Sequence, residues 1–234
     1  MRQKVGLRSS RSSHFSYFAR LAGGLALCVM AATCKGPGPK KIGDATLAPL
    51  AAGGKTLSED AKKAPLVVVL PDSQPTIPDV EMVQLAIDRH VSWGMVKAII
   101  DRMYEHGQTP VLLVAQRQKV LELALSDELL GPPLEVYAQL EGKLCVKHPA
   151  AEEMICTQTY SKKYIDGAHT RELVRKAVLG YERADVQVEL LPALNWGDVV
   201  TAVGATRSCC GKREVRVRLI DSPTDRLVDS PTEG

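Results

Sequence analysis

The chain contains 234 residues, of which 45% are hydrophobic, 24% are charged and 4% are aromatic, and its formal net charge is +3. The positive excess lies in residues 1–33, which hold five basic residues and no acidic one, so the remainder has 25 basic against 27 acidic residues. This remainder has no stripe of Lys and Arg interleaved with aromatic residues, so the charge pattern excludes nucleic acid as the expected partner.

The first 33 residues have the form of a secretory signal peptide. A basic stretch, 1–20, precedes an apolar run of 13 residues, which is shorter than the roughly 18 to 20 residues needed to span a bilayer. The run leads into Ala31-Ala32-Thr33-Cys34, which resembles a bacterial lipobox and predicts that Cys34 is the lipidated first residue of the mature protein. Ordinary cleavage beside Ala31 is the alternative, because Ala31 and Thr33 depart from the usual lipobox residues.

Two different segments follow the signal. Residues 34–63 are rich in Gly, Pro, Ala and Lys, which predicts a flexible tether with at most a weak helix near residues 57–63. The continuous apolar run 65–70 then suits a strand buried on both faces of a sheet. The stretch 72–79 contains two prolines, Pro75 and Pro78, and cannot hold a helix.

Residues 82–114 have the pattern of a strand, a helix and a second strand. Apolar residues at every second position from Val83 to Ile87 predict a half-buried strand. Ser92 is a suitable N-cap for a helix that ends at Gly107, and the apolar run 111–114 supplies the second strand. Residues 116–130 are apolar at helical spacing, which predicts a helical connector that stops at Gly131-Pro132-Pro133.

The second half begins with a hairpin, predicted from strands at residues 134–140 and 143–146 around a Glu-Gly turn. Short strands are expected at residues 154–157 and 163–165, and a helix with an apolar face is expected to close near Gly180. The order of major elements from residue 132 is then β, β, α, β, α, β. About ninety residues of this kind suffice for one modest core.

An internal repeat links the two halves. Trp93-Gly94 aligns with Trp196-Gly197 at an offset of 103, and the same offset aligns the flanking strands and replaces Ser92 with another good cap, Asn195. Asp198 is expected near the positive end of the second helix dipole. With one residue inserted after Gly107, Val111 aligns with Val215. Two copies indicate two similar small units, because they are too few for a solenoid.

The runs LAIDRHVSWGMVKAIIDRMYEHGQTPVLLV and LNWGDVVTAV carry a resemblance to ExbD/TolR biopolymer transport proteins. In that family a strand with an Ala-x-Asp-like end is followed by an aromatic-Gly pair, a helix, a Gly and a strand. The resemblance implies an α+β fold with two ExbD/TolR-like periplasmic units: an abbreviated one with its connector at residues 64–131 and a complete one at 132–221. Residues 222–234 are polar and are expected to be a disordered tail.

The resemblance also implies a function. It suggests a module of the bacterial cell envelope that faces the periplasm and works by protein contact. Together with the predicted lipidation of Cys34, this predicts a non-enzymatic lipoprotein that acts as a protein-binding adaptor in transport or envelope maintenance. Its implied partners are envelope proteins of an ExbB/TolQ- or TonB/TolA-like system or peptidoglycan, and a homodimer is implied as in relatives. The acid-bearing transmembrane helix of that family has no counterpart here, so a proton-coupled stator subunit is not expected. A peptidoglycan-binding structural lipoprotein is the alternative.

Cysteine usage fits an exported protein. Cys145 and Cys156 flank a short polar loop and are expected to form a disulfide between neighbouring strands, with two buried thiols as the alternative. The vicinal pair Cys209-Cys210 is not a C-x-x-C motif, so a thiol redox protein is the less favoured function.

The remaining candidate residues have simpler expected roles. Trp93 and Trp196 are expected to anchor the helix starts in the core, with partner recognition as the alternative. Asp88 is expected to cap or order the loop before Ser92, because no nucleophile or second carboxylate accompanies it. The histidines have no metal-site spacing, so neither a metal nor another cofactor is predicted.

Overall fold

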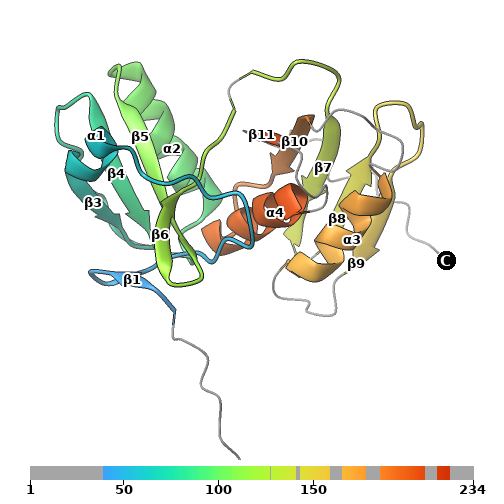
Figure 1. Ribbon diagram of the computed structural model, residues 1–234, viewed down its shortest axis with the longest axis horizontal. Coiled ribbons are helices and arrows are strands. Elements are labelled where there is room, and N and C mark those ends of the chain that lie inside the picture. Colours follow the sequence, from blue (N-terminus) through green and yellow to red (C-terminus); the bar gives the residue numbers. More distant parts are fainter. Residues whose placement is uncertain are drawn as a thin grey trace, which may run out of the picture. The chain divides into compact units, whose positions relative to one another are not determined.

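The computed structural model describes residues 39–126, 128–140, 143–158, 165–177, 185–208 and 215–221, all within one compact unit. These residues form a mixed α+β structure (Figure 1). The elements in chain order are β1 (Lys41–Ile42), β2 (Ala45–Thr46), α1 (Glu59–Lys63), β3 (Leu66–Val69), β4 (Met82–Ile87), α2 (Trp93–Glu105), β5 (Thr109–Gln116), β6 (Lys119–Glu122), β7 (Leu134–Ala138), β8 (Lys143–Lys147), β9 (Ile155–Gln158), α3 (Gly167–Ala177), β10 (Asp185–Leu190), α4 (Trp196–Ser208) and β11 (Arg216–Asp221).

A four-stranded sheet contains the first predicted strand, helix, strand unit. Its strand order is β3-β4-β5-β6, in which β3, β4 and β5 run parallel and β6 is antiparallel to β5. The parallel pair β4 and β5 is joined through α2, as the alternation over residues 83–87 and the apolar run 111–114 predict. Ser92 caps α2 by accepting a hydrogen bond from the N–H of Met95, and Gly107 follows the helix with a φ of 70°. We call β4, α2 and β5 the first repeat.

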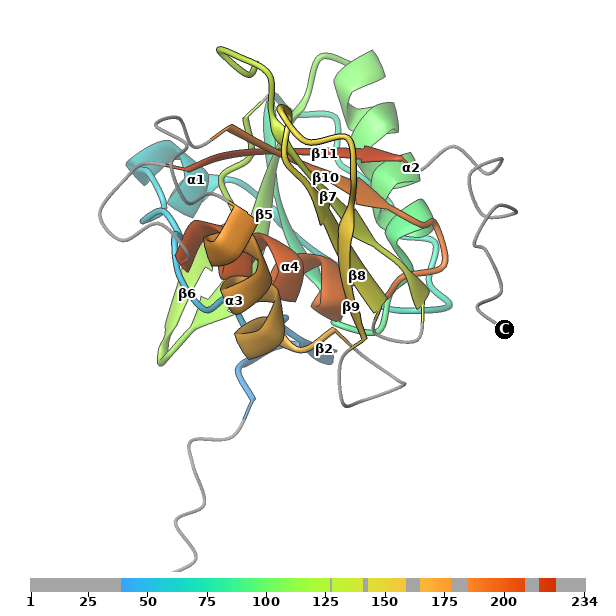
Figure 2. The same ribbon diagram turned by 90° about the vertical axis from the view of Figure 1, so that its right-hand side faces the viewer.

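A five-stranded sheet contains the second unit. Its order is β11-β10-β7-β8-β9, with β7, β10 and β11 parallel and with β8 and β9 added as antiparallel strands. Helices α3 and α4 contact each other and lie on the same sheet (Figures 1 and 2). The predicted hairpin is β7 and β8, and the short strand expected at residues 154–157 is β9. We call β10, α4 and β11 the second repeat.

The pairing registers correct the alignment of the two repeats. In the first repeat Gln84 lies opposite Val111, and in the second Gln187 lies opposite Arg218. Gln84 and Gln187 keep the offset of 103, but Val111 and Arg218 differ by 107. The insertion between helix and final strand is therefore four residues rather than one, and the predicted match of Val111 to Val215 is wrong. Similar apolar residues in both strands allowed the wrong register, which only the hydrogen-bonded ladder resolves.

The segment predicted to be a flexible tether is part of the fold from residue 39 onward. Leu47 is 2% exposed and packs with Ala86 and Leu113 on one face of the four-stranded sheet. Farther along, the N–H of Lys55 donates to the Glu122 carbonyl, and the N–H of Glu122 donates to the Lys55 carbonyl. Apolar residues spaced among the glycines supply this packing, and composition alone obscures them. The weak helix expected near residue 60 is α1, which Ser58 caps.

Two further predictions on the first half need correction. Residues 116–130 do not form a helical connector: β6 turns back on β5 through a two-residue turn at Arg117, whose φ is 55°. The run 65–70 does form a strand, β3, but it is not buried on both faces, because β3 is the edge of its sheet and Leu66 is 47% exposed. No helix lies between β3 and β4, as predicted.

A single hydrophobic cluster extends through both halves. It joins Val83, Leu85 and Ile87 of β4 to Val186, Val188 and Leu190 of β10, together with both tryptophans. Helix α4 is buried on nearly every side, including Val199, Val203 and Thr206, which is the expected state of a helix enclosed by other elements. Across the described residues, no helix is long and apolar enough to cross a membrane. The predicted signal peptide and tail lie outside the described residues. Of the strand predicted at residues 163–165, only Ile165 is described.

Candidate functional site

The two Trp-Gly corners meet at the junction between the repeats. The indole rings of Trp93 and Trp196 stack with their centroids 6.3 Å apart and their planes inclined by 10°. Both residues are buried, with exposed fractions of 4% and 0%. The two tryptophans, which were expected to anchor the helix starts, thus contact each other, and sequence periodicity does not reveal this contact.

The backbone of this junction follows a local two-fold symmetry. The N–H of Trp93 donates to the Leu194 carbonyl at 2.7 Å, and the N–H of Trp196 donates to the Val91 carbonyl at 2.7 Å. Leu194 and Val91 are themselves related by the offset of 103. Each helix therefore places its first free N–H group on the loop that precedes the other helix, which satisfies donors that an isolated helix leaves unpaired.

The glycines beside the tryptophans take part in the same exchange. The N–H of Gly94 donates to the Pro192 carbonyl at 2.9 Å, and the N–H of Gly197 donates to the Arg89 carbonyl at 2.8 Å. A Cβ at Gly94 would lie 3.2 Å from the Pro192 Cβ, and a Cβ at Gly197 would lie 3.1 Å from the Arg89 oxygen. A side chain at either glycine would therefore be tightly placed and would require its neighbour to move by a few tenths of an ångström.

The two indole N–H groups break the symmetry. Trp93 Nε1 donates to Asp221 Oδ1 at 3.1 Å, and Lys97 Nζ lies 3.5 Å from Asp221 Oδ2. Trp196 Nε1 is buried and has no hydrogen-bond partner among the residues the structure describes. The register places Val114 where the second repeat has Asp221, so the first repeat offers an apolar side chain in place of an acceptor. Among the described residues, only packing contacts hold the second indole ring.

Asp88 orders the loop before α2, as predicted, and also fastens the N-terminal segment. Its Oδ2 accepts from the N–H of Thr46 at 2.8 Å, and its Oδ1 accepts from the N–H of His90 at 2.9 Å. Burial, the largest single influence, opposes ionisation, but the hydrogen bonds from His90 and Thr46 together outweigh it. The pKa of Asp88 therefore lies below its ordinary value.

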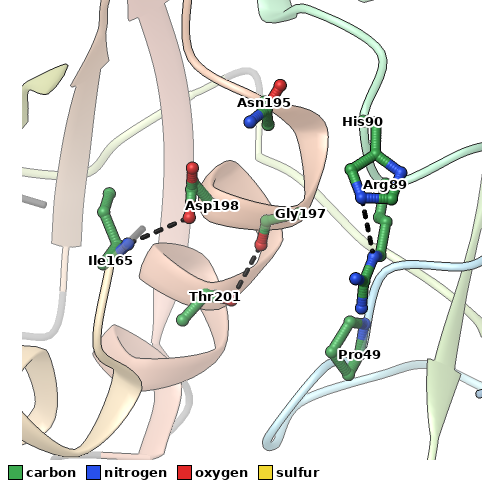
Figure 3. Close-up of a pocket in the computed structure, with 8 residues that line it drawn as sticks. All are labelled: Pro49, Arg89, His90, Ile165, Asn195, Gly197, Asp198 and Thr201. Atoms are coloured by element: carbon green, nitrogen blue, oxygen red, sulfur yellow. Dashed lines mark hydrogen bonds between the residues drawn. The ribbon is translucent and has the colours of Figure 1, made fainter. Parts of the chain in front are cut away.

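A pocket opens beside the junction (Figure 3). Its volume is about 570 Å³, within the range of small-molecule sites. Its walls come from the N-terminal segment, the loop before α2, the loop before α3 and the start of α4. The lining residues are Pro49, Arg89, His90, Ile165, Asn195, Gly197, Asp198 and Thr201. Sequence reasoning named Asn195, Gly197 and Asp198 as parts of the repeated helix start and considered His90 among the histidines, but it assigned none of them to a pocket. The available signal was the polar Asp-Arg-His run between strand and helix cap.

Asp198 and Arg89 carry the opposite charges of this pocket. Asp198 is 9% exposed, and its Oδ1 accepts from the N–H of Ile165 at 2.9 Å. Burial raises the pKa of Asp198, and the hydrogen bond from Ile165 only partly offsets this. Arg89 Nε lies 3.2 Å from His90 Nε2, while His90 Nδ1 lies 2.9 Å from Asp88 Oδ1. A neutral His90 with its proton on Nδ1 satisfies both contacts.

The predicted cysteine pair is brought together. Cys145 on β8 lies directly opposite Cys156 on β9, and their sulfur atoms are 2.08 Å apart, a disulfide distance. The pair joins the edge strand β9 to the sheet. Cys34, Cys209 and Cys210 lie outside the described residues. Within the described part of the chain, no group of three or more His, Cys, Asp or Glu residues is placed to hold a metal ion.

Comparison of the chain with protein-family models, curated proteins and solved structures gives no match.

Proposed function

We propose that this chain is a non-enzymatic envelope lipoprotein whose periplasmic part, similar to ExbD/TolR modules, binds an extended segment of a partner protein. It would act as an adaptor in transport or envelope maintenance, anchored to the membrane through Cys34. The Trp-Gly repeat supports the resemblance, and the paired cysteines suit an oxidising compartment. The observation that carries the binding role is the open apolar edge of the four-stranded sheet at β3.

Strand β3 has the features of an edge that accepts another strand. Its residues are Leu66 to Val69, all β-branched or aliphatic, and Leu66 is 47% exposed. The carbonyls of Pro65 and Val69 accept from the N–H groups of Gln84 and Asp88 on the inner side. Backbone groups alternate along a parallel ladder, so those of Leu66 and Val68 face away from β4. Backbone groups that point outward along a strand edge can hydrogen-bond to an extended segment of a partner, which is the β-augmentation mode of binding.

The opposite edge of the same sheet is less accessible. Lys55 pairs with Glu122 of β6 through two reciprocal backbone hydrogen bonds. A partner strand would therefore add at β3 rather than at β6. Homodimerisation, which the resemblance implies, would also need a surface other than the Trp-Gly corners, because these corners contact each other within one chain.

Site-specific photo-crosslinking in the native bacterium tests the binding role. A photoreactive amino acid at Leu66 is expected to capture an envelope protein, identified by mass spectrometry. The same amino acid at Tyr104, which is 56% exposed on α2, is the matched control and should not capture that protein. Equal capture from both positions, or none from Leu66 while other surface positions react, would refute the edge as the binding site. Capture of peptidoglycan fragments would favour the alternative structural role.

Lipid anchoring is tested separately. Cys34→Ser is expected to abolish labelling by a radioactive fatty acid and to release the protein from membranes. Membrane retention of the unlabelled variant would show that another segment anchors the chain and would remove the lipoprotein part of the proposal.

A further inference from the structure

The pocket beside the repeat junction is lined by two charged residues of opposite sign, Arg89 and Asp198. Figure 3 shows Asp198 and Thr201 on α4 at one side and Arg89 with His90 at the other, with the pocket between them. Asp198 is 9% exposed, and among the residues that the structure describes only its Oδ1 accepts a hydrogen bond from another element, that of the Ile165 N–H. Figure 3 shows its second oxygen turned away from Ile165.

The cationic wall is also oriented and has spare donors. Arg89 Nε faces His90 Nε2, which leaves the terminal nitrogens of the guanidinium available. Among the residues described, no carboxylate forms an ion pair with Arg89. The fork of a guanidinium matches a carboxylate through two parallel hydrogen bonds. The backbone of Arg89 is fixed on both sides, by Thr46 and by Gly197.

The start of α4 does not provide an alternative anion site. Its first N–H groups are already donated to the carbonyls of Val91 and Arg89 across the junction, and that of Asp198 is donated to Asn195. A helix N-terminus attracts anions through free N–H groups, which are occupied here. In addition, the Asp198 carboxylate repels an anion from this wall. An anionic group in the pocket is therefore directed to Arg89, and a cationic group to Asp198.

We infer that this pocket binds a small zwitterionic ligand of the amino-acid or short-peptide class, with its carboxylate on Arg89 and its ammonium group on Asp198. Asn195 and Thr201 supply further polar groups on the α4 wall. The inference does not rest on the proposed envelope role, since it uses the junction pocket and not the edge of β3. Either proposal can fail without the other.

The experiment uses alanine and two alanine peptides, which differ in the distance between the terminal ammonium and carboxylate groups. L-alanine, L-alanyl-L-alanine and tri-L-alanine, each with free termini, are titrated into the purified protein by calorimetry and ligand-detected NMR. At least one is expected to bind, and N-acetylation or C-terminal amidation of that probe should each weaken binding by about tenfold or more. Because the caps alter the ligand only, this comparison does not depend on the folding of a variant.

Two variants then assign the ends. Arg89→Gln should lower the affinity for the probe with free termini, and C-terminal amidation should then cause no further loss of affinity. Asp198→Asn should also lower the affinity for this probe, and N-acetylation should then cause no further loss. Arg102→Gln and Asp101→Asn on α2 are the charge-matched controls and should leave binding unchanged. Absence of binding by every probe at millimolar concentration overturns the inference. Equal binding of capped and free probes, or binding unaffected by both pocket variants, overturns it as well.

Discussion

Trp93 and Trp196 stack with nearly parallel rings across the junction of the two repeats, so the tryptophan at the start of each helix packs against its own counterpart. The reciprocal hydrogen bonds of Trp93 with Leu194 and of Trp196 with Val91 extend this symmetry to the backbone. The chain thus contains an internal pair of related units that complete each other. The four-stranded sheet, which has no helix between β3 and β4, shares one hydrophobic cluster with the second repeat.

The tryptophan pair should make coupled contributions to stability. Trp93→Ala and Trp196→Ala are each expected to lower the free energy of unfolding by about 3 to 5 kcal/mol, the usual cost of removing a buried aromatic side chain. The double variant should lose less than the sum, by about 0.5 to 1.5 kcal/mol, because the stacking contact is lost only once. Denaturant unfolding of the four proteins measures this, and strict additivity would contradict an energetic role for the stack.

Adding a methyl group at either glycine of the junction should lower the stability of the protein. Gly94→Ala and Gly197→Ala are each expected to lower stability by about 1 to 3 kcal/mol, since a new Cβ would press against the backbone of Pro192 or Arg89. An unobstructed Gly→Ala change within a helix raises stability by up to about 1 kcal/mol. The sign of the change in the free energy of unfolding, measured by thermal and denaturant unfolding, therefore tests whether the glycines lie as close to Pro192 and Arg89 as described.

Asp88 should give the protein a specific pH dependence. The fold lowers its pKa from the ordinary value of 3.8, so its stabilising contribution is fully present above that value. The contribution is lost as the pH falls through the lowered pKa of the folded state. Asp88→Asn is expected to cost about 1 to 3 kcal/mol near neutral pH, because it weakens hydrogen bonds to a charged group. The difference from the parent should shrink as the pH falls below 3.8 and through the lowered pKa, and a difference that stays constant with pH would contradict this prediction.

The N-terminal segment should behave as part of the core. Leu47→Ala and Leu50→Ala remove side chains that are 2% and 3% exposed, and each is expected to cost about 2 to 5 kcal/mol. Lys55→Ala, in the same segment but exposed, is the control and should change stability by less than about 0.5 kcal/mol. If both leucine variants unfold like the parent protein, residues 39–63 are not docked as described.

The cysteine pair should stabilise the edge of the five-stranded sheet. Replacing both Cys145 and Cys156 with Ser is expected to cost about 2 to 3 kcal/mol, because the bridge closes a short loop with a sequence separation of 11. A reducing agent should destabilise the parent by a similar amount and leave the double variant unchanged. An equal response of both proteins to reduction would place the effect at other cysteines.

The sequence by itself determined the local elements around the Trp-Gly corners. The Ser92 cap, the end of α2 at Gly107 and the pairing of Cys145 with Cys156 follow from short-range chemistry, which acts within a few residues or across one hairpin. The repeat offset of 103 was also visible, since it depends only on identities. By contrast, the apolar spacing of residues 116–130 suits either a helix or a strand. Part of this stretch forms the strand β6 because it pairs with β5.

Only the tertiary structure determined how the two repeats and the N-terminal segment pack against one another. The stacking of Trp93 on Trp196 joins residues far apart in the chain, and no spacing rule encodes that contact. The burial of Leu47 was hidden in a segment whose glycines and prolines indicate flexibility, because composition does not record which few apolar side chains find a surface. The pocket lined by Arg89 and Asp198 has the same origin: its charged residues come from different repeats and line one pocket only in the folded chain.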